Sequence, residues 1–315
     1  MPFIRLARIL IEIIFPSKCM GCGSFFYSSR YAAQRNNTSA EAFEWETMTF
    51  EKVMAPFLCS ECLSNFLPVD SPLCAVCGYV FKSREGKDHL CGNCIEHPKH
   101  FGKARALGIY DKTLMEVIHS FKYKEKLQLV RPLEELLFSV FVRNWNMDDF
   151  DIVVPVPLHI KRFRKRGFNQ AYLLVRDWQE IAGMFKAEPK QAALFPLPAA
   201  ESAKECKSDS ISFDRISLKR SEPCGVKLKS GNFAIGKDVL SRTVWTQPQT
   251  GLGRKQRMEN IKGAFSICDE FKVEGKKILL VDDVYTTGAT VDECAKAILG
   301  GGAVSVDVLT LARAV

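Results

Sequence analysis

Two adjacent carboxylates, Asp282 and Asp283, directly follow a short apolar run in the segment ILLVDDVYTTGAT. The run, residues 278–281, predicts a strand buried on both faces of a parallel sheet, and ligands of such sheets bind at the carboxyl ends of the strands. Residues 286–290 then supply hydroxyls and backbone N–H groups ahead of a helix, whose positive end can hold a phosphate. The acids would repel that phosphate, so they should face sugar hydroxyls or Mg²⁺. The segment predicts a ribose 5-phosphate site; the alternative is a buried strand followed by a polar turn and a capped helix.

This segment resembles the phosphoribosyl pyrophosphate (PRPP) loop of type I phosphoribosyltransferases. In that family an apolar strand precedes two acidic residues, a variable pair and a sequence like TTGAT. The resemblance implies that Asp282 and Asp283 are the catalytic pair and hold the ribose 2′ and 3′ hydroxyls, with Mg²⁺ accompanying PRPP. It also implies a set of PRPP-binding residues: Asp282, Asp283, Val284, Tyr285, Thr286, Thr287, Gly288, Ala289 and Thr290.

Eight of the twelve cysteines form four CxxC pairs before residue 95. Two thiolates at this spacing supply two corners of a zinc tetrahedron, and a site closed by four thiolates is structural. We favour sequential pairing into two Zn²⁺ sites, made of Cys19, Cys22, Cys59 and Cys62 and of Cys74, Cys77, Cys91 and Cys94. Interleaved pairing is the alternative for the metal sites, and redox pairs or free buried thiols are the alternatives to metal. Reduced thiols indicate a cytoplasmic protein.

A basic cluster lies in PVPLHIKRFRKRGFNQA, after a predicted strand at residues 152–156. Five cations within six residues repel one another unless anions or solvent compensate them. Because this cluster follows a strand in the same part of the chain as the PRPP-like loop, we expect it to bind pyrophosphate or a nucleic-acid backbone. Arg162 and Arg166 are the expected pyrophosphate or anion contacts; a solvated basic turn is the alternative.

Taken together, four segments are similar to those of the ComF family of bacterial proteins: IFPSKCMGCG, VPVPLHIKRFRKRGFNQAYLL, QTGLGRKQRMENIKGAF and ILLVDDVYTTGAT. The similarity covers nearly the whole chain except the insert between Cys22 and Cys59 and a stretch at about residues 198–237. It implies a double zinc ribbon joined to a phosphoribosyltransferase domain, and a role in DNA uptake during natural transformation. It also implies partners among the proteins of the DNA-uptake machinery.

The segment QTGLGRKQRMENIKGAF, residues 249–265, combines glycines with several cations. Type I phosphoribosyltransferases carry a mobile loop before the PRPP strand, which closes over the reaction centre and excludes water. By position this segment would be that loop or its base, with Arg254 and Arg257 contacting pyrophosphate. The alternative is the start of a basic amphipathic helix.

These sites need an α/β scaffold, and the order of apolar segments predicts one. Strands are expected at residues 104–110, 152–156, 278–283 and 304–311, and helices at 114–142, 168–185 and 291–299. Strands that alternate with helices indicate a parallel sheet, here of the type I phosphoribosyltransferase kind, flanked by helices. We expect an amphipathic helix at 1–15, a double zinc-ribbon domain at 16–100, and a phosphoribosyltransferase-like domain at 103–315 with an insertion at about 198–237.

Composition narrows the function. With 315 residues, 47% hydrophobic content and a net charge of +8, the chain can form two domains and favours an anionic partner. The apolar run in residues 1–15 is too short to span a bilayer, so we expect no transmembrane segment; contact with a membrane surface is the alternative to packing on the protein. The favoured function is PRPP binding together with single-stranded DNA binding. The alternative is a Mg²⁺-dependent enzyme that moves phosphoribose to a nucleobase or a related nitrogen acceptor.

Overall fold

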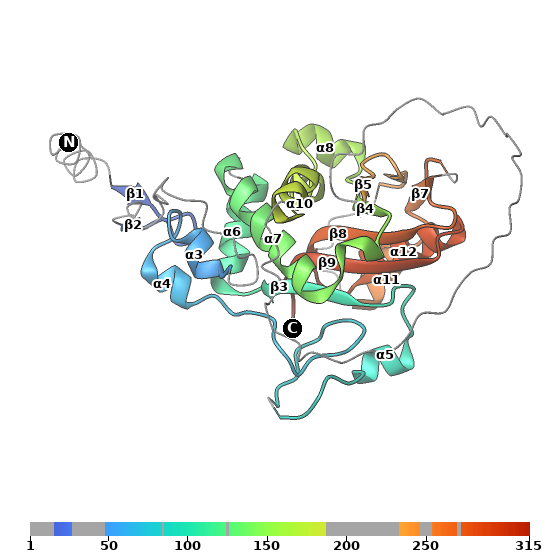
Figure 1. Cartoon of the computed structure of the whole chain (residues 1–315), viewed down its shortest axis with the longest axis horizontal. Helices are drawn as coiled ribbons and strands as arrows, with labels where there is room; N and C mark the ends of the chain where they lie inside the picture. Colours follow the sequence, from blue (N-terminus) through green and yellow to red (C-terminus); the bar gives the residue numbers. More distant parts are fainter. Residues whose placement is uncertain are drawn as a thin grey trace, which may run out of the picture.

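A five-stranded parallel sheet forms the centre of the molecule (Figure 1). The computed structural model describes residues 16–26, 48–83, 85–123, 126–186, 233–245, 254–269 and 272–315. The strand order is β3-β9-β8-β4-β5, with β3 Ala104–Ile109, β4 Ile152–Pro155, β5 Ala234–Ile235, β8 Lys277–Tyr285 and β9 Ser305–Arg313. Every pairing in this sheet is parallel. The predicted α/β class with a parallel sheet is therefore confirmed.

Helices cover both faces of the sheet. They are α6 Lys112–Tyr123, α7 Val130–Asn144, α8 Ile160–Arg166, α9 Gln170–Leu173, α10 Trp178–Lys186, α11 Arg254–Ile261 and α12 Ala289–Gly300. Successive side chains of a strand point to opposite faces. On β8, Leu279 and Val281 join a core with α6, α7 and α10, whereas Ile278 and Leu280 join a second core with α12. We call these the α6 face and the α12 face.

Small elements complete the described structure. The cysteine-rich segment contains the antiparallel pair β1 Ser17–Lys18 and β2 Phe25–Phe26, and the short helices α3 Phe50–Met54, α4 Ser60–Ser64 and α5 Gly92–Glu96. Two 3₁₀ turns, η2 Leu127–Leu129 and η3 Met147–Asp149, flank α7. A second antiparallel pair is formed by β6 Leu240–Arg242 and β7 Phe265–Ile267.

The long helix predicted at residues 114–142 is two helices, α6 and α7. Pro132 lies in the first turn of α7, where its missing N–H and fixed φ are tolerated. In the interior of one continuous helix the same proline would remove a hydrogen bond and clash with the preceding turn. The prediction followed apolar periodicity alone and therefore missed the break.

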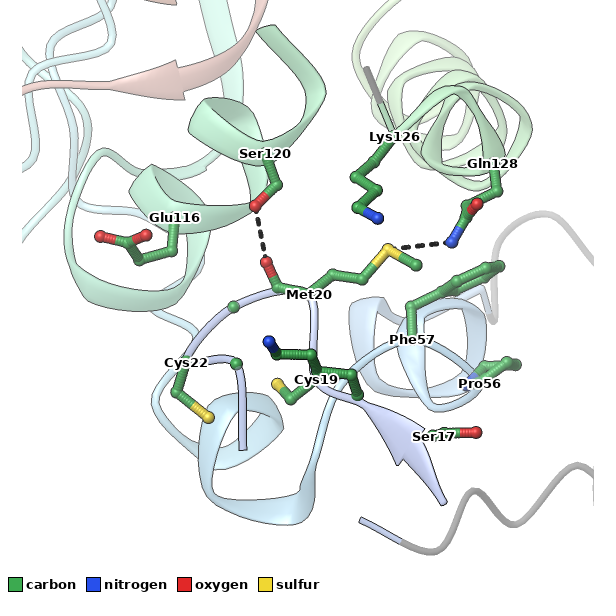
Figure 2. A pocket seen from close by; sticks show the side chains of 13 residues that line it. Ser17, Cys19, Met20, Cys22, Pro56, Phe57, Glu116, Ser120, Lys126 and Gln128 are labelled. Carbon is green, nitrogen blue, oxygen red and sulfur yellow. Dashed lines mark hydrogen bonds between the residues drawn. The ribbon is translucent and has the colours of Figure 1, made fainter. Parts of the chain in front are cut away.

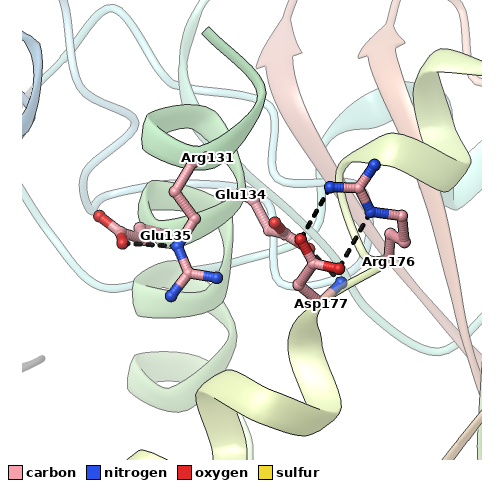
Figure 3. Close-up of polar contacts among 5 residues, drawn as sticks. All are labelled: Arg131, Glu134, Glu135, Arg176 and Asp177. Carbon is pink, nitrogen blue, oxygen red and sulfur yellow. Dashed lines mark hydrogen bonds and ion pairs between the residues drawn. The ribbon is translucent and has the colours of Figure 1, made fainter. Parts of the chain in front are cut away.

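The helix predicted at residues 168–185 is also interrupted, between α9 and α10. The backbone N–H of Asp177, just before α10, donates to the Glu134 carboxylate at 2.6 Å. That long-range bond satisfies an N–H at the beginning of α10, which otherwise has no partner within the helix. Figure 3 shows this contact and the Arg176–Asp177 ion pair beside it. The break therefore depends on Glu134, a residue of α7 that is 43 positions away in the sequence.

Three further boundaries differ from prediction. The basic segment 160–166 is itself a helix, α8, which ends at Gly167 with a left-handed φ of 81°. Residues 254–261 of the predicted mobile loop form helix α11. The last residues of the predicted insertion include β5, which pairs with β4 at the edge of the main sheet. The predictions for residues 1–15 and for most of the two inserts lie outside the described residues.

Candidate functional site

Asp282 and Asp283 lie near the carboxyl end of β8, the middle strand of the sheet. The strand predicted at residues 278–283 continues beyond both acids and ends at Tyr285. Because side chains alternate along a strand, the two carboxylates lie on opposite faces. Asp283, on the α6 face, is 5% exposed, and its Oδ1 forms an ion pair with Lys122 Nζ at 2.8 Å. Asp282 is half-buried, and its Oδ1 accepts the Asp283 backbone N–H at 2.8 Å.

Burial and the charge of Asp283 raise the pKa of Asp282 above its ordinary range, while Lys122 and Arg242 act in the opposite direction. Asp283 Oδ2 is buried and has no hydrogen-bond partner among the described residues. Two carboxylates held this close gain from any partner that supplies positive charge or hydrogen-bond donors. A divalent cation or the hydroxyls of a sugar would be such partners.

The turn at residues 286–288 connects the acids to helix α12. Gly288 has a φ of 78° and lies immediately before the helix, and a Cβ at this position would collide with the Tyr285 ring. Only glycine combines that backbone conformation with so little space. Thr287 Oγ1 accepts the Ala289 N–H at 3.4 Å. The turn therefore presents hydroxyls and backbone N–H groups at the positive end of a three-turn helix, a geometry that suits a phosphate.

Several cations gather near the acidic pair. Burial and then the charge of Arg166 lower the pKa of Arg162, and burial and then the charge of Arg162 lower the pKa of Arg242. Arg162 therefore lies close enough to both Arg166 and Arg242 for repulsion, and Arg242 also acts on Asp282. An anion placed between them would relieve the repulsion. The side chains of Arg254 and Arg257, on α11, lie outside the described part of the structure.

Sequence reasoning missed Lys122 and Arg242. Lys122 stands in HSFKYKEK, which the sequence predicted only as part of a helix. Arg242 lies on β6, next to the poorly patterned insertion. Both residues are far from residue 282 in the sequence, and only the packing of α6 and β6 beside the end of β8 brings them there. A lysine at the end of an amphipathic helix carries no local signal for such a role.

An exposed aromatic ring lies among the cations of α8. Trp245 is 43% exposed, with Lys161 Nζ at 5.3 Å and Arg162 Cζ at 5.6 Å from its ring centroid. Phe163, on the same helix, is also 43% exposed. We call Trp245, Lys161, Arg162 and Phe163 the Trp245 surface. Phe168, which follows α8, instead packs against Phe121 in the core.

The eight CxxC cysteines form two compact clusters, and within each the four sulfur atoms lie within 4.8 Å of one another. The first contains Cys19, Cys22, Cys59 and Cys62, and the second Cys74, Cys77, Cys91 and Cys94. The favoured sequential pairing is therefore confirmed. In each cluster one backbone N–H, that of Cys59 or of Cys91, donates to a sulfur at 3.4 Å, which stabilises a thiolate. Four converging sulfurs fit a tetrahedral metal ion, and the donor set is that of structural zinc.

The first cluster borders a cavity of about 1120 Å³ between the cysteine loop and the end of α6 (Figure 2). Ser120 Oγ donates to the Met20 carbonyl at 2.8 Å across its edge. Lys18, Glu116 and Lys126 give the lining mixed charge. The acidic pair of β8 is not part of this lining. The cavity is therefore a feature of the first cluster and not of the site at the sheet.

Comparison with known proteins agrees with this architecture. No family model matches the chain. It is 28% identical over 260 residues to the DNA utilization protein YhgH of Escherichia coli K12, covering 81% of this chain and 90% of the relative. It is 26% identical over 277 residues to competence protein F of Haemophilus influenzae, covering 82% and 97%. It is 23% identical over 264 residues to competence protein ComFC of Bacillus subtilis, covering 81% and 84%.

The fold and the clusters define an α/β protein with a phosphoribosyltransferase-like parallel sheet and two N-terminal four-cysteine clusters that could each hold a metal ion. These features match those expected from the four sequence segments. The relatives, named as DNA utilization and competence proteins and aligned over about four fifths of the chain, support its assignment to the ComF family. No helix among the described residues is long and apolar enough to cross a membrane.

Proposed function

We propose that this protein binds PRPP with Mg²⁺ at the end of β8 and acts in DNA uptake or utilization in the cytoplasm. The observation that supports the first part is the location of two carboxylates, a glycine turn before a helix, and several cations at the same end of the sheet. The names of the relatives, DNA utilization protein and competence protein, support the second part of the proposal.

In this proposal each part of PRPP has its own partners. Asp282 and Asp283 hold the ribose hydroxyls and Mg²⁺, because oxygen ligands suit that ion. Residues 286–290 hold the 5-phosphate with N–H groups and hydroxyls. Arg162, Arg166 and Arg242 face the pyrophosphate, whose charge offsets their mutual repulsion. Arg254 and Arg257 belong to the same proposed set from α11.

Calorimetric titration with PRPP and Mg²⁺ tests the site. The double variant Asp282→Asn with Asp283→Asn should bind at least about tenfold more weakly, because it removes the charges that hold Mg²⁺ and the hydroxyls. Asp269→Asn is the matched control, since Asp269 pairs with Lys272 at the surface. Unchanged affinity in the double variant, with the sheet still folded by circular dichroism, would refute the assignment of the acids.

The same arrangement would also support phosphoribosyl transfer. Departure of pyrophosphate leaves positive charge on the ribose, so cations must stabilise the leaving group while the acids fix the sugar. A nitrogen nucleophile would then attack C1. Incubation with PRPP, Mg²⁺ and a panel of nucleobases separates the two functions. Release of pyrophosphate with one base establishes an enzyme, whereas bound PRPP without release across the panel supports a binding role.

Single-stranded DNA is the proposed macromolecular partner, and the Trp245 surface is where it would bind. Aromatic rings stack on bases, and neighbouring cations neutralise phosphates. A variant replaces Lys161 of this surface and its exposed neighbours on α8, Arg164 and Lys165, with Gln, and it leaves Arg162 and Arg166 in place. The slope of log affinity against log salt should then fall by about two to three for single strands. An equal slope in the variant and the parent would remove this surface from the proposal.

We also propose that residues 16–100 form a zinc-dependent domain and residues 103–315 the PRPP-binding domain. Each four-cysteine cluster would hold one structural Zn²⁺, because four thiolates leave no open position for a substrate. Elemental analysis of the untagged protein should find two zinc ions per chain. Fewer than one zinc per chain would contradict the assignment.

A further inference from the structure

The last residues of β9 include a buried arginine, Arg313, that contacts the second cysteine cluster. Arg313 is only 6% exposed, and its Nη2 donates to Cys77 Sγ at 3.4 Å. Arg313 Cζ also lies 4.3 Å from the ring centroid of Tyr285. Arg313 and Tyr285 are direct partners across the β8–β9 pairing. The Arg313 guanidinium thus lies between the Cys77 sulfur and the ring of Tyr285, the residue that precedes the turn at residues 286–288.

The charge of Arg313 needs a partner, because an unpaired buried guanidinium is strongly destabilising. Among the residues that the structure describes, no carboxylate lies within ion-pair distance of Arg313. A zinc ion held by four thiolates carries a net charge of about −2. The second cluster with its metal is therefore the counter-ion that makes burial of Arg313 favourable.

Tyr285 connects Arg313 to the turn at residues 286–288. It is 3% exposed, and its ring fills the space into which any side chain at Gly288 would project. Phe101, which follows the second cluster in the chain, packs edge-on against Tyr285 with ring centroids 6.3 Å apart. The His100 backbone N–H donates to Asp292 Oδ1, in the first turn of α12, at 2.8 Å. The second cluster, the turn and the start of α12 are therefore packed as one unit.

We propose that Arg313 is a positioning residue that makes metal binding at the second cluster and ligand binding at residues 286–290 depend on each other. With zinc bound, the cluster holds the guanidinium, the guanidinium holds the Tyr285 ring, and the ring supports the Gly288 turn. Without zinc, the charge of Arg313 is unbalanced, so the guanidinium and Tyr285 lose this arrangement. Thermodynamic linkage then requires that a ligand on the turn strengthens zinc binding by the same factor. As far as the ligand is PRPP, the inference rests on the proposed function.

Zinc release to a chromophoric chelator tests the first step. Arg313→Met should accelerate release of one of the two zinc ions by about tenfold or more, because contacts to metal ligands typically change metal affinity by about 10- to 100-fold. Arg313→Lys keeps the charge and should restore part of the slow release. Arg105→Met is the matched control, since Arg105 lies near the same cluster but donates to the carbonyls of Ala75 and Ala104. It should change the rate much less.

Hydrogen exchange of the turn tests the second step without PRPP. Removing the second zinc should increase exchange in the peptide that contains residues 286–290, and Arg313→Met should show the faster exchange even with zinc bound. Wild-type zinc release in Arg313→Met, or exchange of the turn that is unaffected by removal of the second zinc, would overturn the inference. Arg313→Lys provides both measurements if Arg313→Met does not fold.

Saturating Mg²⁺ and PRPP provide the third measurement. They should slow release of the same zinc ion in the parent protein and leave the rate unchanged in Arg313→Met. If calorimetry finds no PRPP binding by the parent protein, the proposed function fails, while zinc release and hydrogen exchange still decide the role of Arg313. If PRPP binds but does not alter zinc release in the parent protein, the proposed function stands and the coupling is refuted.

Discussion

The two cysteine clusters have the same donor set but different surroundings. Cys19, Cys59 and Cys62 belong to the core of the α6 face, whereas Cys74, Cys77 and Cys94 belong to the core of the α12 face. Figure 1 accordingly shows α3 and α4 at one end of the molecule and α5 below the sheet. The clusters therefore attach to the sheet from opposite sides.

Their contacts with the sheet domain also differ in kind. Next to the first cluster, hydroxyls of α6 donate to backbone carbonyls: Thr113 Oγ1 to Cys62 at 2.7 Å and Ser120 Oγ to Met20 at 2.8 Å. At the second cluster a buried guanidinium donates to a ligand sulfur. A neutral bond to a carbonyl does not depend directly on the metal charge, whereas the contact of Arg313 does. We therefore propose that the two clusters, with the same donor set, have a local structural role on one face and a longer-range role on the other.

Removing one cysteine from each cluster should give the largest difference. Cys59→Ser and Cys94→Ser should each reduce the zinc content from about two ions to about one, because structural sites need all four ligands. PRPP affinity should fall more in Cys94→Ser, since that cluster contacts Arg313. Elemental analysis and calorimetry on both variants measure this. Equal losses of affinity in the two variants would mean that the clusters do not differ in their effect on the turn.

Lys122 connects α6, the helix beside the first cluster, to the acidic pair. Lys122→Met should lower the free energy of unfolding by about 3–5 kcal/mol, because it leaves the buried Asp283 carboxylate unpaired. Lys112→Met, at the exposed start of the same helix, should cost less than about 0.5 kcal/mol. Urea unfolding of both variants checks the prediction. A small effect at Lys122 would indicate that the α6 face contributes little to holding the acids.

Glu134 sets a pH dependence that involves neither cluster. Its side chain is fully buried, and burial raises its pKa to about 7. Between the ordinary pKa of glutamate, about 4.3, and this raised value the folded state holds a proton that the unfolded state has lost. The free energy of unfolding should therefore fall as pH rises from about 4.5 to 7, by about 3 kcal/mol, and level off above.

Glu134→Gln should remove that slope, which thermal unfolding at pH 5.5, 7 and 8 would measure. Protonation of the cysteine ligands acts in the opposite direction, because metal affinity falls in acid. Comparison of the two proteins thus isolates the acid sensitivity of the clusters. A slope that persists in Glu134→Gln would show that another group, such as Asp282, causes it.

The smallest effect should come from Thr113. Thr113→Val keeps the shape of the side chain but leaves the Cys62 carbonyl without this donor, at a cost of about 1 kcal/mol. Zinc release from the second cluster and PRPP affinity should not change. Urea unfolding together with chelator kinetics tests both statements. A change in the second zinc would contradict the separation of the two faces.

Local patterns predicted the elements that depend on neighbours in the sequence. They predicted the strand β8, the parallel sheet and the grouping of the four CxxC pairs. Buried strands and metal knuckles need particular residues at short spacing. The breaks between α6 and α7 and between α9 and α10 were missed. The first depends on a proline, which a periodicity argument does not consider, and the second on the hydrogen bond that the Asp177 N–H donates to Glu134.

By itself the sequence determined the resemblance to the ComF family, the grouping of eight cysteines into two clusters, and the segment that forms the acidic strand and glycine turn. Only the tertiary structure decided which residues surround them. Lys122 on α6 and Arg242 on β6 reach the end of β8 through packing, and Arg313 on β9 reaches the second cysteine cluster in the same way. The physical reason is that a charge acts over distance in space, whereas residue spacing along the chain records only contacts within one element.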